Sequence, residues 1–207
     1  MPIWCKICGI TSAADARVVE QAGADAIGLN CYPPSPRYIE PEMVGVLSGA
    51  VACKRVALFV DPEPAQVRAV LDVAEIDILQ FQGDESPEFC GQFGLPYMKG
   101  IRMSAETSVA ELVERYENAW AFLLDTFVEG VPGGTGRRFD LELWPDLPDL
   151  RLVLAGGLDP QNVAAAVTQV SPFGVDVAGG VEGTTKRRED PVRVEQFVQE
   201  VRSVRSD

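Results

Sequence analysis

Short runs of apolar and β-branched residues recur along the chain at a regular interval, and each run has the length of a β-strand. Stretches with the apolar spacing of helices lie between successive runs. The expected strands are Ile3–Cys8, Ala24–Cys31, Arg55–Val60, Ile76–Phe81, Tyr97–Arg102, Trp120–Asp125, Arg151–Ala155 and Gly174–Ala178. The expected helices are Ala13–Ala22, Pro41–Gly49, Pro64–Val73, Ser86–Phe93, Val109–Asn118, Pro160–Val170 and Val192–Val204.

Regular alternation of strand and helix predicts parallel strands joined by right-handed crossovers, which leaves an open doubly wound sheet or a closed barrel. The turn after the first strand, Cys8-Gly9-Ile10-Thr11, lacks the dinucleotide-binding fingerprint typical of many doubly wound sheets. Eight units in 207 residues predict instead an α/β fold, a single-domain (β/α)8 TIM barrel over residues 1–207. One unit departs from the pattern, because a Gly-rich loop and Leu141–Leu143 follow the sixth strand in place of a helix.

The chain contains no histidine, so the commonest general acid–base side chain is absent and proton chemistry falls to Cys, Asp, Glu, Lys or Tyr. The five cysteines show no disulfide-scaffold spacing. Cys5 and Cys8 have the spacing of a chelating pair, but residues three apart in a strand point to opposite faces. The sequence therefore predicts no metal site.

The net charge is −13, which argues against nucleic acid or an anionic membrane as a partner. An anionic substrate would then need a local cluster of backbone N–H groups, Lys or Arg. The longest apolar runs are too short to span a membrane, and Lys6 interrupts the first of them, so no signal peptide is expected. We expect a cytoplasmic protein, and a monomer with a homodimer as the alternative.

Strand parity predicts which side chains enter the barrel, because inward and outward residues alternate along each strand. Lys6 and Cys8 belong to the less apolar set of the first strand and are expected to point inward. The same parity adds Gln80, Gln82, Asp125 and Asp176. A purely structural core would not collect this set, because each buried charge needs a partner. We therefore expect an active site where the strands end.

Two glycine pairs close the last two expected strands, Gly156-Gly157 and Gly179-Gly180. Glycine at such a turn lets backbone N–H groups approach a phosphate closely, and a following helix N-terminus adds its positive end. The loops after strands 7 and 8 are also where barrels of this type often bind phosphate. One pair alone is typical of a tight turn, but two pairs at both loops predict a phosphate site.

Two loops at the same end carry further candidates. Gly133, Gly134, Thr135 and Gly136 follow the sixth strand and predict a lid over the site, although alone they are also typical of an ordinary flexible loop. Arg37 follows the second strand and is a candidate for binding a substrate carboxylate, although an isolated Arg is more often a solvated surface residue.

The chain resembles the phosphoribosylanthranilate isomerase family of tryptophan biosynthesis nearly from end to end. The motifs that carry the resemblance are Lys6-Ile7-Cys8-Gly9-Ile10-Thr11, Gly23-Ala24-Asp25-Ala26-Ile27-Gly28, Ser35-Pro36-Arg37-Tyr38, Gln80-Phe81-Gln82-Gly83-Asp84-Glu85, Leu124-Asp125, Gly133-Gly134-Thr135-Gly136, Phe139-Asp140, Ala155-Gly156-Gly157-Leu158, Asn162-Val163, Val175-Asp176 and Gly180-Val181-Glu182. Each motif is modest alone, but so many in the same order are highly specific.

The resemblance implies an Amadori rearrangement of N-(5-phosphoribosyl)anthranilate, without metal or organic cofactor. It implies that Asp125 protonates the ribose ring oxygen, that the Cys8 thiolate removes the C2 proton, and that Arg37 holds the anthranilate carboxylate. We expect the Lys6 ammonium to pair with Asp176 and to lower the pKa of Cys8, and desolvation to keep Asp125 protonated. Residues expected to contact the substrate are Lys6, Arg37, Gln80, Gln82 and Asp176.

The sequence departs from the family pattern in three places. Gln82 stands where the family usually has His, so an amide replaces an imidazole. Ala178-Gly179 replaces a usual Ser-Ser, which removes two hydroxyls that could bind phosphate. The segment Gly183 to Asp190 is a looser match to the usual Gly-x-Lys-Asp. These changes concern binding and leave Cys8 and Asp125 in position.

Two other functions stay open on the sequence alone. One is a bifunctional or histidine-pathway sugar isomerase on the same barrel, which would be expected to carry Asp at the position of Cys8 and stronger two-fold internal similarity. The other is a barrel that binds phosphate without catalysis, against which the presence of both Cys8 and Asp125 argues. Substrate turnover separates these functions.

Overall fold

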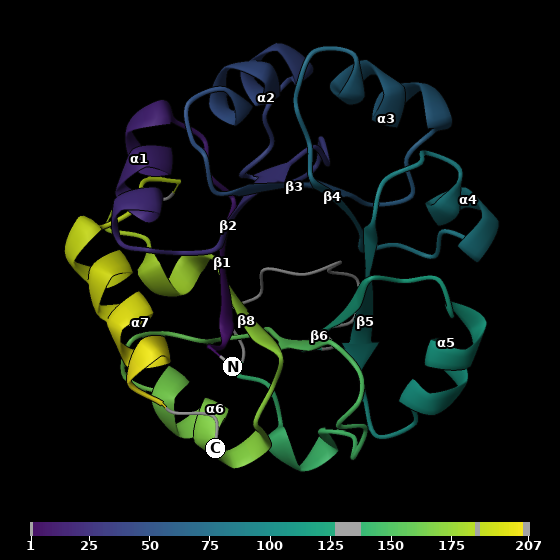
Figure 1. The fold of residues 1–207 in the computed structure, drawn as a ribbon, viewed down its shortest axis with the longest axis vertical. Coiled ribbons are helices and arrows are strands. Elements are labelled where there is room, and N and C mark those ends of the chain that lie inside the picture. Colours follow the sequence, from purple (N-terminus) through teal and green to yellow (C-terminus); the bar gives the residue numbers. More distant parts are fainter. Residues whose placement is uncertain (1, 127–137, 185–186, 205–207) are drawn as a thin grey trace.

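Eight parallel strands form a closed barrel in which every strand pairs with its neighbours in chain order, and β8 returns to β1 (Figure 1). This computed structural model describes residues 2–126, 138–184 and 187–204. The strands are β1 Trp4–Cys8, β2 Ala26–Asn30, β3 Lys54–Phe59, β4 Ile78–Phe81, β5 Tyr97–Met103, β6 Ala121–Thr126, β7 Leu152–Leu154 and β8 Gly174–Val177. The expected (β/α)8 barrel is confirmed, with strand ends shifted by one or two residues.

The helices form a ring outside the strands, as Figure 1 shows. They are α1 Ala13–Gln21, α2 Pro41–Ser48, α3 Pro64–Leu71, α4 Pro87–Gly91, α5 Val109–Arg115, α6 Val163–Val170 and α7 Pro191–Ser203. Two short 3-10 helices, η1 Leu141–Leu143 and η2 Gly179–Val181, follow β6 and β8. The segment expected to break the helical pattern after the sixth strand is η1, so this prediction is also confirmed.

Local hydrogen bonds explain where several helices begin. Asp190 accepts hydrogen bonds from the backbone N–H groups of Val192 and Arg193 and so caps α7. The expected sixth helix was placed to begin at Pro160, but α6 begins three residues later, at Val163. Asp159 accepts hydrogen bonds from the two N–H groups that follow Pro160, at 2.8 and 3.0 Å, and forms a separate turn there.

The barrel has two apolar layers because side chains alternate across each strand. Outward residues such as Ile7, Ile27 and Leu79 pack beneath the helices in the larger core. Inward residues form a smaller core inside the barrel, which includes Met98 and Val153. The interior is thus filled by side chains over much of its length, and the remaining space lies at the end where the strands finish.

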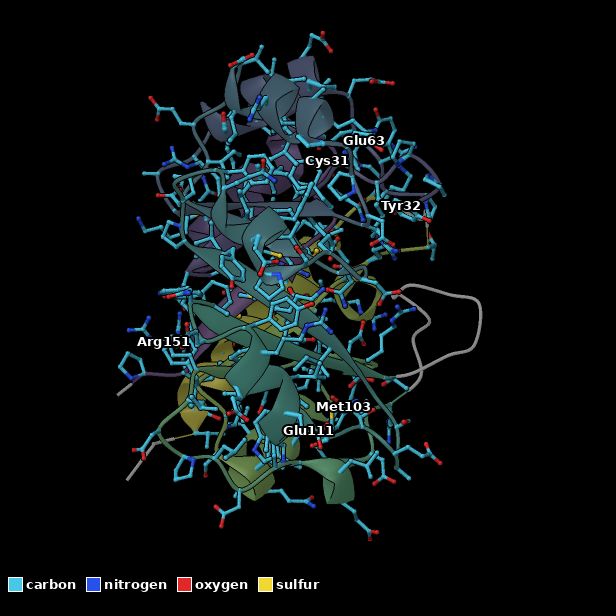
Figure 2. The ribbon with its side chains drawn as sticks, turned by 90° about the vertical axis from the view of Figure 1, so that its right-hand side faces the viewer. Cys31, Tyr32, Glu63, Met103, Glu111 and Arg151 are labelled. Carbon is cyan, nitrogen blue, oxygen red and sulfur yellow. The ribbon has the colours of Figure 1, made fainter. Side chains whose placement is uncertain are left out.

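An aromatic cluster closes the opposite end of the barrel, where the strands begin. The rings of Trp4 and Trp120 lie 5.7 Å apart, and Phe173 contacts both. The Arg151 guanidinium lies over the Trp120 ring at 5.3 Å. Figure 2 shows Arg151 at this end and Tyr32 at the other. The first end is closed by packed aromatic rings, and the second carries the loops that follow the strands.

Candidate active site

A cavity of about 580 Å³ opens at the C-terminal ends of the strands. Its lining includes residues that end or follow seven of the eight strands, all but β5, and it includes Tyr32, which Figure 2 labels. The sequence-predicted residues that line it are Cys8, Arg37, Gln80, Gln82, Asp125, Gly156, Gly157, Asp176, Gly179 and Gly180. Lys6 lies one layer deeper and is fully buried. The structure therefore brings together all of the predicted site residues that it describes.

Lys6 and Asp176 form a buried ion pair on adjacent strands, where the register sets them side by side. The Lys6 Nζ to Asp176 Oδ1 distance is 2.8 Å, as the sequence hypothesis required. Burial by itself would lower the pKa of Lys6, but the Asp176 carboxylate raises the pKa above its ordinary value and keeps the side chain an ammonium. Burial also raises the pKa of Asp176, and the Lys6 charge opposes this shift.

Cys8 ends β1 and points into the cavity, where Gly28 on the neighbouring strand makes room for it. A Cβ on Gly28 would lie 2.7 Å from the Cys8 Sγ. Burial raises the pKa of the Cys8 thiol, and the Lys6 ammonium lowers it by a smaller amount. The expectation that Lys6 would bring this pKa below its ordinary value is wrong for the free protein. The reason is that burial outweighs the Lys6 charge, and the Asp176 carboxylate, which pairs with Lys6, raises the pKa of Cys8 further.

Asp125 lies near the end of β6 and lines the same cavity. Burial raises the pKa of Asp125 to about 6, and a hydrogen bond from the Thr126 backbone N–H, at 2.8 Å, opposes the shift. The nearby Asp176 carboxylate raises the pKa further, while Lys6 lowers it. The expected direction is confirmed, so Asp125 holds its proton far better than an exposed aspartate does.

Gln80 and Gln82 form a buried amide pair along one wall of the cavity. The Gln80 Nε2 donates to the Gln82 Oε1 at 3.0 Å, and the Gln80 Oε1 is buried without a partner among the described residues. Gly100 on β5 makes room for this pair, because a Cβ there would lie 2.3 Å from the Gln82 Oε1. The unpartnered oxygen is a ready acceptor for a hydroxyl group of a ligand.

The loops after β7 and β8 meet at the cavity. A Cβ on Gly180 would lie 1.8 Å from the Leu158 carbonyl oxygen, so the two loops touch at a point where only glycine fits. Gly156 and Gly157 both have positive φ, at 93° and 61°, and Gly156 packs against Asp125 and Thr126. The two glycine pairs predicted to bind phosphate therefore lie on touching loops, and η2 begins at Gly179.

Arg37 is held at the cavity by an ion pair, so the reading of an isolated surface Arg is wrong. The Arg37 Nε lies 2.6 Å from the Glu182 Oε1, and the Arg37 side chain is 15% exposed. Gly9, with a φ of 92°, makes room for the arginine stem, because a Cβ there would lie 2.3 Å from the Arg37 Cδ. This arrangement aims the guanidinium toward Gly179 at the cavity wall.

Sequence reasoning missed several residues of the site, and Asn30 and Glu182 are the two that bear most on its polar contacts. Asn30 ends β2 and lines the cavity, and strand parity with Ala26 and Gly28 could have identified it. Glu182 was noted only as part of a motif, because nothing in the sequence reveals that a residue 145 positions away holds Arg37. The looser segment that follows contributes Asp190 as the cap of α7 and Glu189 as a buried neighbour of Glu182.

Some predictions fall outside what the structure tests. Gly133, Gly134, Thr135 and Gly136, the expected lid, lie outside the described residues. Within the described ranges, no group of three or more Cys, Asp or Glu side chains has a geometry that could hold a metal ion. No helix among the same residues is long and apolar enough to cross a membrane.

Comparison with known proteins gives one consistent answer. The family model of N-(5'-phosphoribosyl)anthranilate (PRA) isomerase matches residues 5–200. The N-(5'-phosphoribosyl)anthranilate isomerase of Stutzerimonas stutzeri is 47% identical over 203 residues, which cover 96% of this chain and 97% of the relative.

Solved structures agree with the sequence comparison. Phosphoribosyl anthranilate isomerase from Thermotoga maritima aligns with a TM-score of 0.87 at 33% identity, over 98% of this chain and 100% of that chain. A second structure, at 32% identity with a TM-score of 0.83 and the same coverage, is of such an isomerase in complex with reduced 1-(o-carboxyphenylamino)-1-deoxyribulose 5-phosphate. A third, with a TM-score of 0.84 at 32% identity and the same coverage, is of monomers generated from the dimeric Thermotoga maritima enzyme. The chain therefore belongs to the N-(5'-phosphoribosyl)anthranilate isomerase family.

Proposed function

We propose that this enzyme, an aldose–ketose isomerase of tryptophan biosynthesis, rearranges N-(5'-phosphoribosyl)anthranilate with Asp125 as general acid and Cys8 as general base. The observation that carries the assignment is that a carboxyl with a raised pKa and a thiol line one cavity, at the ends of β6 and β1. Burial raises the pKa of Asp125 to about 6, which suits a group that must give a proton near neutral pH.

The reaction proceeds by a series of proton transfers. Asp125 protonates the ribose ring oxygen, the C1–O bond breaks, and the electron pair on the anthranilate nitrogen forms an iminium ion at C1. The Cys8 thiolate then removes the C2 proton, the C–H electrons form the C1=C2 bond of an enolamine, and the iminium electrons return to nitrogen. C1 then gains a proton while the C2 hydroxyl loses one, which converts the enolamine to the ketone, so the product is an isomer of the substrate.

The raised pKa of Cys8 in the free protein is compatible with this role. An iminium ion in the cavity adds a positive charge close to the thiol, and a nearby cation favours the thiolate. The Lys6 ammonium already acts in the same direction. The base is therefore formed most readily at the step that needs it, after the ring has opened.

The two ends of the substrate have separate candidate contacts. Backbone N–H groups of Gly156-Gly157 and Gly179-Gly180 would receive the phosphate, which an acidic chain can hold through peptide dipoles. Arg37 would receive the anthranilate carboxylate as a charge-assisted hydrogen-bond donor. Lys6, Gln80, Gln82 and Asp176 line or support the space between these ends.

The decisive experiment follows the loss of anthranilate-type fluorescence when purified protein meets freshly made N-(5'-phosphoribosyl)anthranilate. We expect wild-type turnover, and losses on the order of 10² to 10⁴ in kcat for Cys8→Ala and for Asp125→Asn. Thermal melting of each variant controls for misfolding. Turnover that survives Cys8→Ala would move the base elsewhere. Absence of wild-type turnover would favour the histidine-pathway substrate, and failure with that substrate a barrel that binds phosphate without catalysis.

Assembly and location follow from the sequence as proposals. We propose a cytoplasmic monomer, with the homodimer as the alternative that the dimeric Thermotoga maritima enzyme keeps open. Sedimentation of the purified chain over a range of concentrations distinguishes the two states.

A further inference from the structure

The Glu182 carboxylate binds the Nε of Arg37, so the two terminal nitrogens of the guanidinium are left on the side of the cavity. The Nε donates to the Glu182 Oε1 at 2.6 Å. Among the described residues, the two terminal nitrogens of Arg37 have no carboxylate or carbonyl partner. One of them, Nη2, lies 3.3 Å from where a Cβ on Gly179 would stand, and Gly179 lines the cavity. Glu182 therefore fixes the direction in which Arg37 presents its free donors.

A second carboxyl group, Glu189, lies beside the first one. Glu182 and Glu189 face each other in an antiparallel bridge, flanked by backbone hydrogen bonds from Gly183 to Arg188 and from Asp190 to Val181. Both glutamates are 8% exposed. The Glu189 Oε2 is buried and has no hydrogen-bond partner among the described residues. Two acidic side chains therefore lie close together in a poorly solvated environment.

The charges around Glu189 come from three directions. Glu182 adds a negative charge from the end of η2, Asp15 adds one from α1, and Arg37 adds a positive charge from the loop after β2. Asp15 is compensated by Arg188, whose Nε lies 3.2 Å from it, and by a hydrogen bond from Ser12. Arg37 is already paired with Glu182. Among the described residues no cation forms an ion pair with Glu189, and Arg37 is the cation whose charge acts on it.

Glu189 therefore holds a proton more firmly than an exposed glutamate does. Burial raises the pKa of Glu189 to about 8, and the charges of Glu182 and Asp15 act in the same direction, with Arg37 opposing them. At neutral pH Glu189 is therefore mostly protonated. Above pH 8 its negative charge appears and acts on Arg37.

We propose that Glu182 is a positioning residue for Arg37 and that Glu189 must stay neutral for Arg37 to bind the ligand's carboxylate at full strength. Ionised Glu189 competes for the guanidinium and repels the incoming carboxylate, so binding weakens as it loses its proton. This inference rests on the proposed function, in which Arg37 receives the anthranilate carboxylate. It adds two residues and a pH dependence that the isomerase reaction does not itself require.

The test measures ligand binding rather than turnover, so that ionisation of the Cys8 thiol does not contribute to the pH dependence. Reduced 1-(o-carboxyphenylamino)-1-deoxyribulose 5-phosphate is titrated calorimetrically into protein carrying Cys8→Ser, between about pH 7.5 and 9.5, where nearly all of its phosphate is dianionic. We expect its Kd to rise on the order of tenfold above pH 8. Adding Glu189→Gln should abolish the rise, while Glu200→Gln, the same change on the exposed face of α7, should leave it in place.

Two further measurements separate positioning from a general structural effect. Inorganic phosphate should bind the glycine loops equally in all these proteins, because it carries no carboxylate. In the protein that retains Cys8, Glu182→Gln should raise KM on the order of tenfold and change kcat little, because Arg37 loses its anchor while Cys8 and Asp125 remain. A proportional fall in kcat would overturn the positioning role of Glu182.

The outcomes distinguish this inference from the function beneath it. Binding of the analogue with the same alkaline weakening in Glu189→Gln overturns the role of Glu189 and leaves the isomerase assignment intact. Absence of analogue binding at every pH overturns the Arg37 assignment and this inference together.

Discussion

Two buried lysine–carboxylate pairs are found among the described residues of the barrel, and they lie on opposite sides of the strand wall. Lys6 and Asp176 point into the barrel beneath the cavity, with Nζ to Oδ1 at 2.8 Å. Lys99 and Glu85 lie on the outer side, between the strands and the helices, with Nζ to Oε2 also at 2.8 Å. The distance between the charges is the same in both pairs. The pairs differ in how completely the surrounding protein supplies hydrogen-bond partners to the charged groups.

The outer pair is enclosed by fixed partners. Lys99 also donates to the Gly83 carbonyl and lies over the Tyr116 ring, at 5.4 Å from its centre. The other Glu85 oxygen accepts hydrogen bonds from the backbone N–H groups of Asp61 and Gly83, at 2.9 and 3.1 Å. This network ties the loops after β3 and β4 to β5. We interpret it as structural, because its hydrogen-bonding capacity is used within the protein.

The inner pair is only partly satisfied. Asp176 is also a wall of the cavity, its pKa is raised by burial, and its charge reaches both Cys8 and Asp125. Its position lets a change in the cavity alter the protonation of three groups at once. The comparison teaches that burial of a charge pair does not by itself reveal a function, whereas incomplete satisfaction next to a cavity does.

The largest expected effect is on the inner pair. Lys6→Met should lower kcat/KM on the order of 10²- to 10⁴-fold, because the ammonium that favours the Cys8 thiolate is lost. The pKa of Cys8 should rise, which the pH dependence of thiol alkylation measures. Stability should fall less than for a fully enclosed pair, because Asp176 can take up a proton and faces the cavity. Unchanged stability together with unchanged Cys8 titration would contradict the pairing.

The matched change in the outer pair should show the reverse. Lys99→Met should lower the free energy of unfolding by about 3 to 5 kcal/mol, because Glu85 is left buried without its cation. The kcat/KM of the folded protein should stay within roughly tenfold of wild type, since Lys99 does not line the cavity. Urea unfolding and assays on the folded fraction give both quantities. A large loss of activity without loss of stability would reverse the assignment of the two pairs.

The sequence predicted the features of the site that depend on local spacing. Alternation of strand and helix fixed the architecture, and parity along single strands identified Lys6, Cys8, Gln80 and Asp125 as inward. These inferences need only local spacing and the closure of the barrel. The ion pair of Lys6 with Asp176 was expected across the barrel, and it forms instead between neighbouring strands, because closure of the barrel sets β8 beside β1.

What the sequence could not supply depends on the balance of several long-range charges. The raised pKa of Cys8 results from burial and Asp176 together outweighing Lys6, and no spacing rule gives that sum. Nor could spacing reveal that Arg37 is anchored by Glu182, or that Glu189 lies beside this anchor without a cation of its own. Such groups meet only when loops of different units pack together.

The smallest expected effect concerns stability alone, and it distinguishes Asp125, a carboxyl in the cavity, from an exposed carboxyl such as Asp146. Because the pKa of Asp125 is about 6 when folded and near 3.8 when unfolded, the folded state binds its proton more tightly between these values. Stability from this group is therefore full below pH 3.8 and is lost as pH rises toward 6, by at most about 1.4 kcal/mol per pH unit. Asp125→Asn should remove this fall, so the stability of the variant relative to wild type should improve by up to about 3 kcal/mol between pH 4 and 6.5, as measured by urea unfolding at each pH.

Asp146→Asn, at an exposed carboxyl, is the control and should leave the wild-type dependence of stability on pH unchanged. A slope in Asp125→Asn equal to that of wild type would mean that Asp125 is ionised in the free enzyme, and a different group would then have to supply the proton that opens the sugar ring.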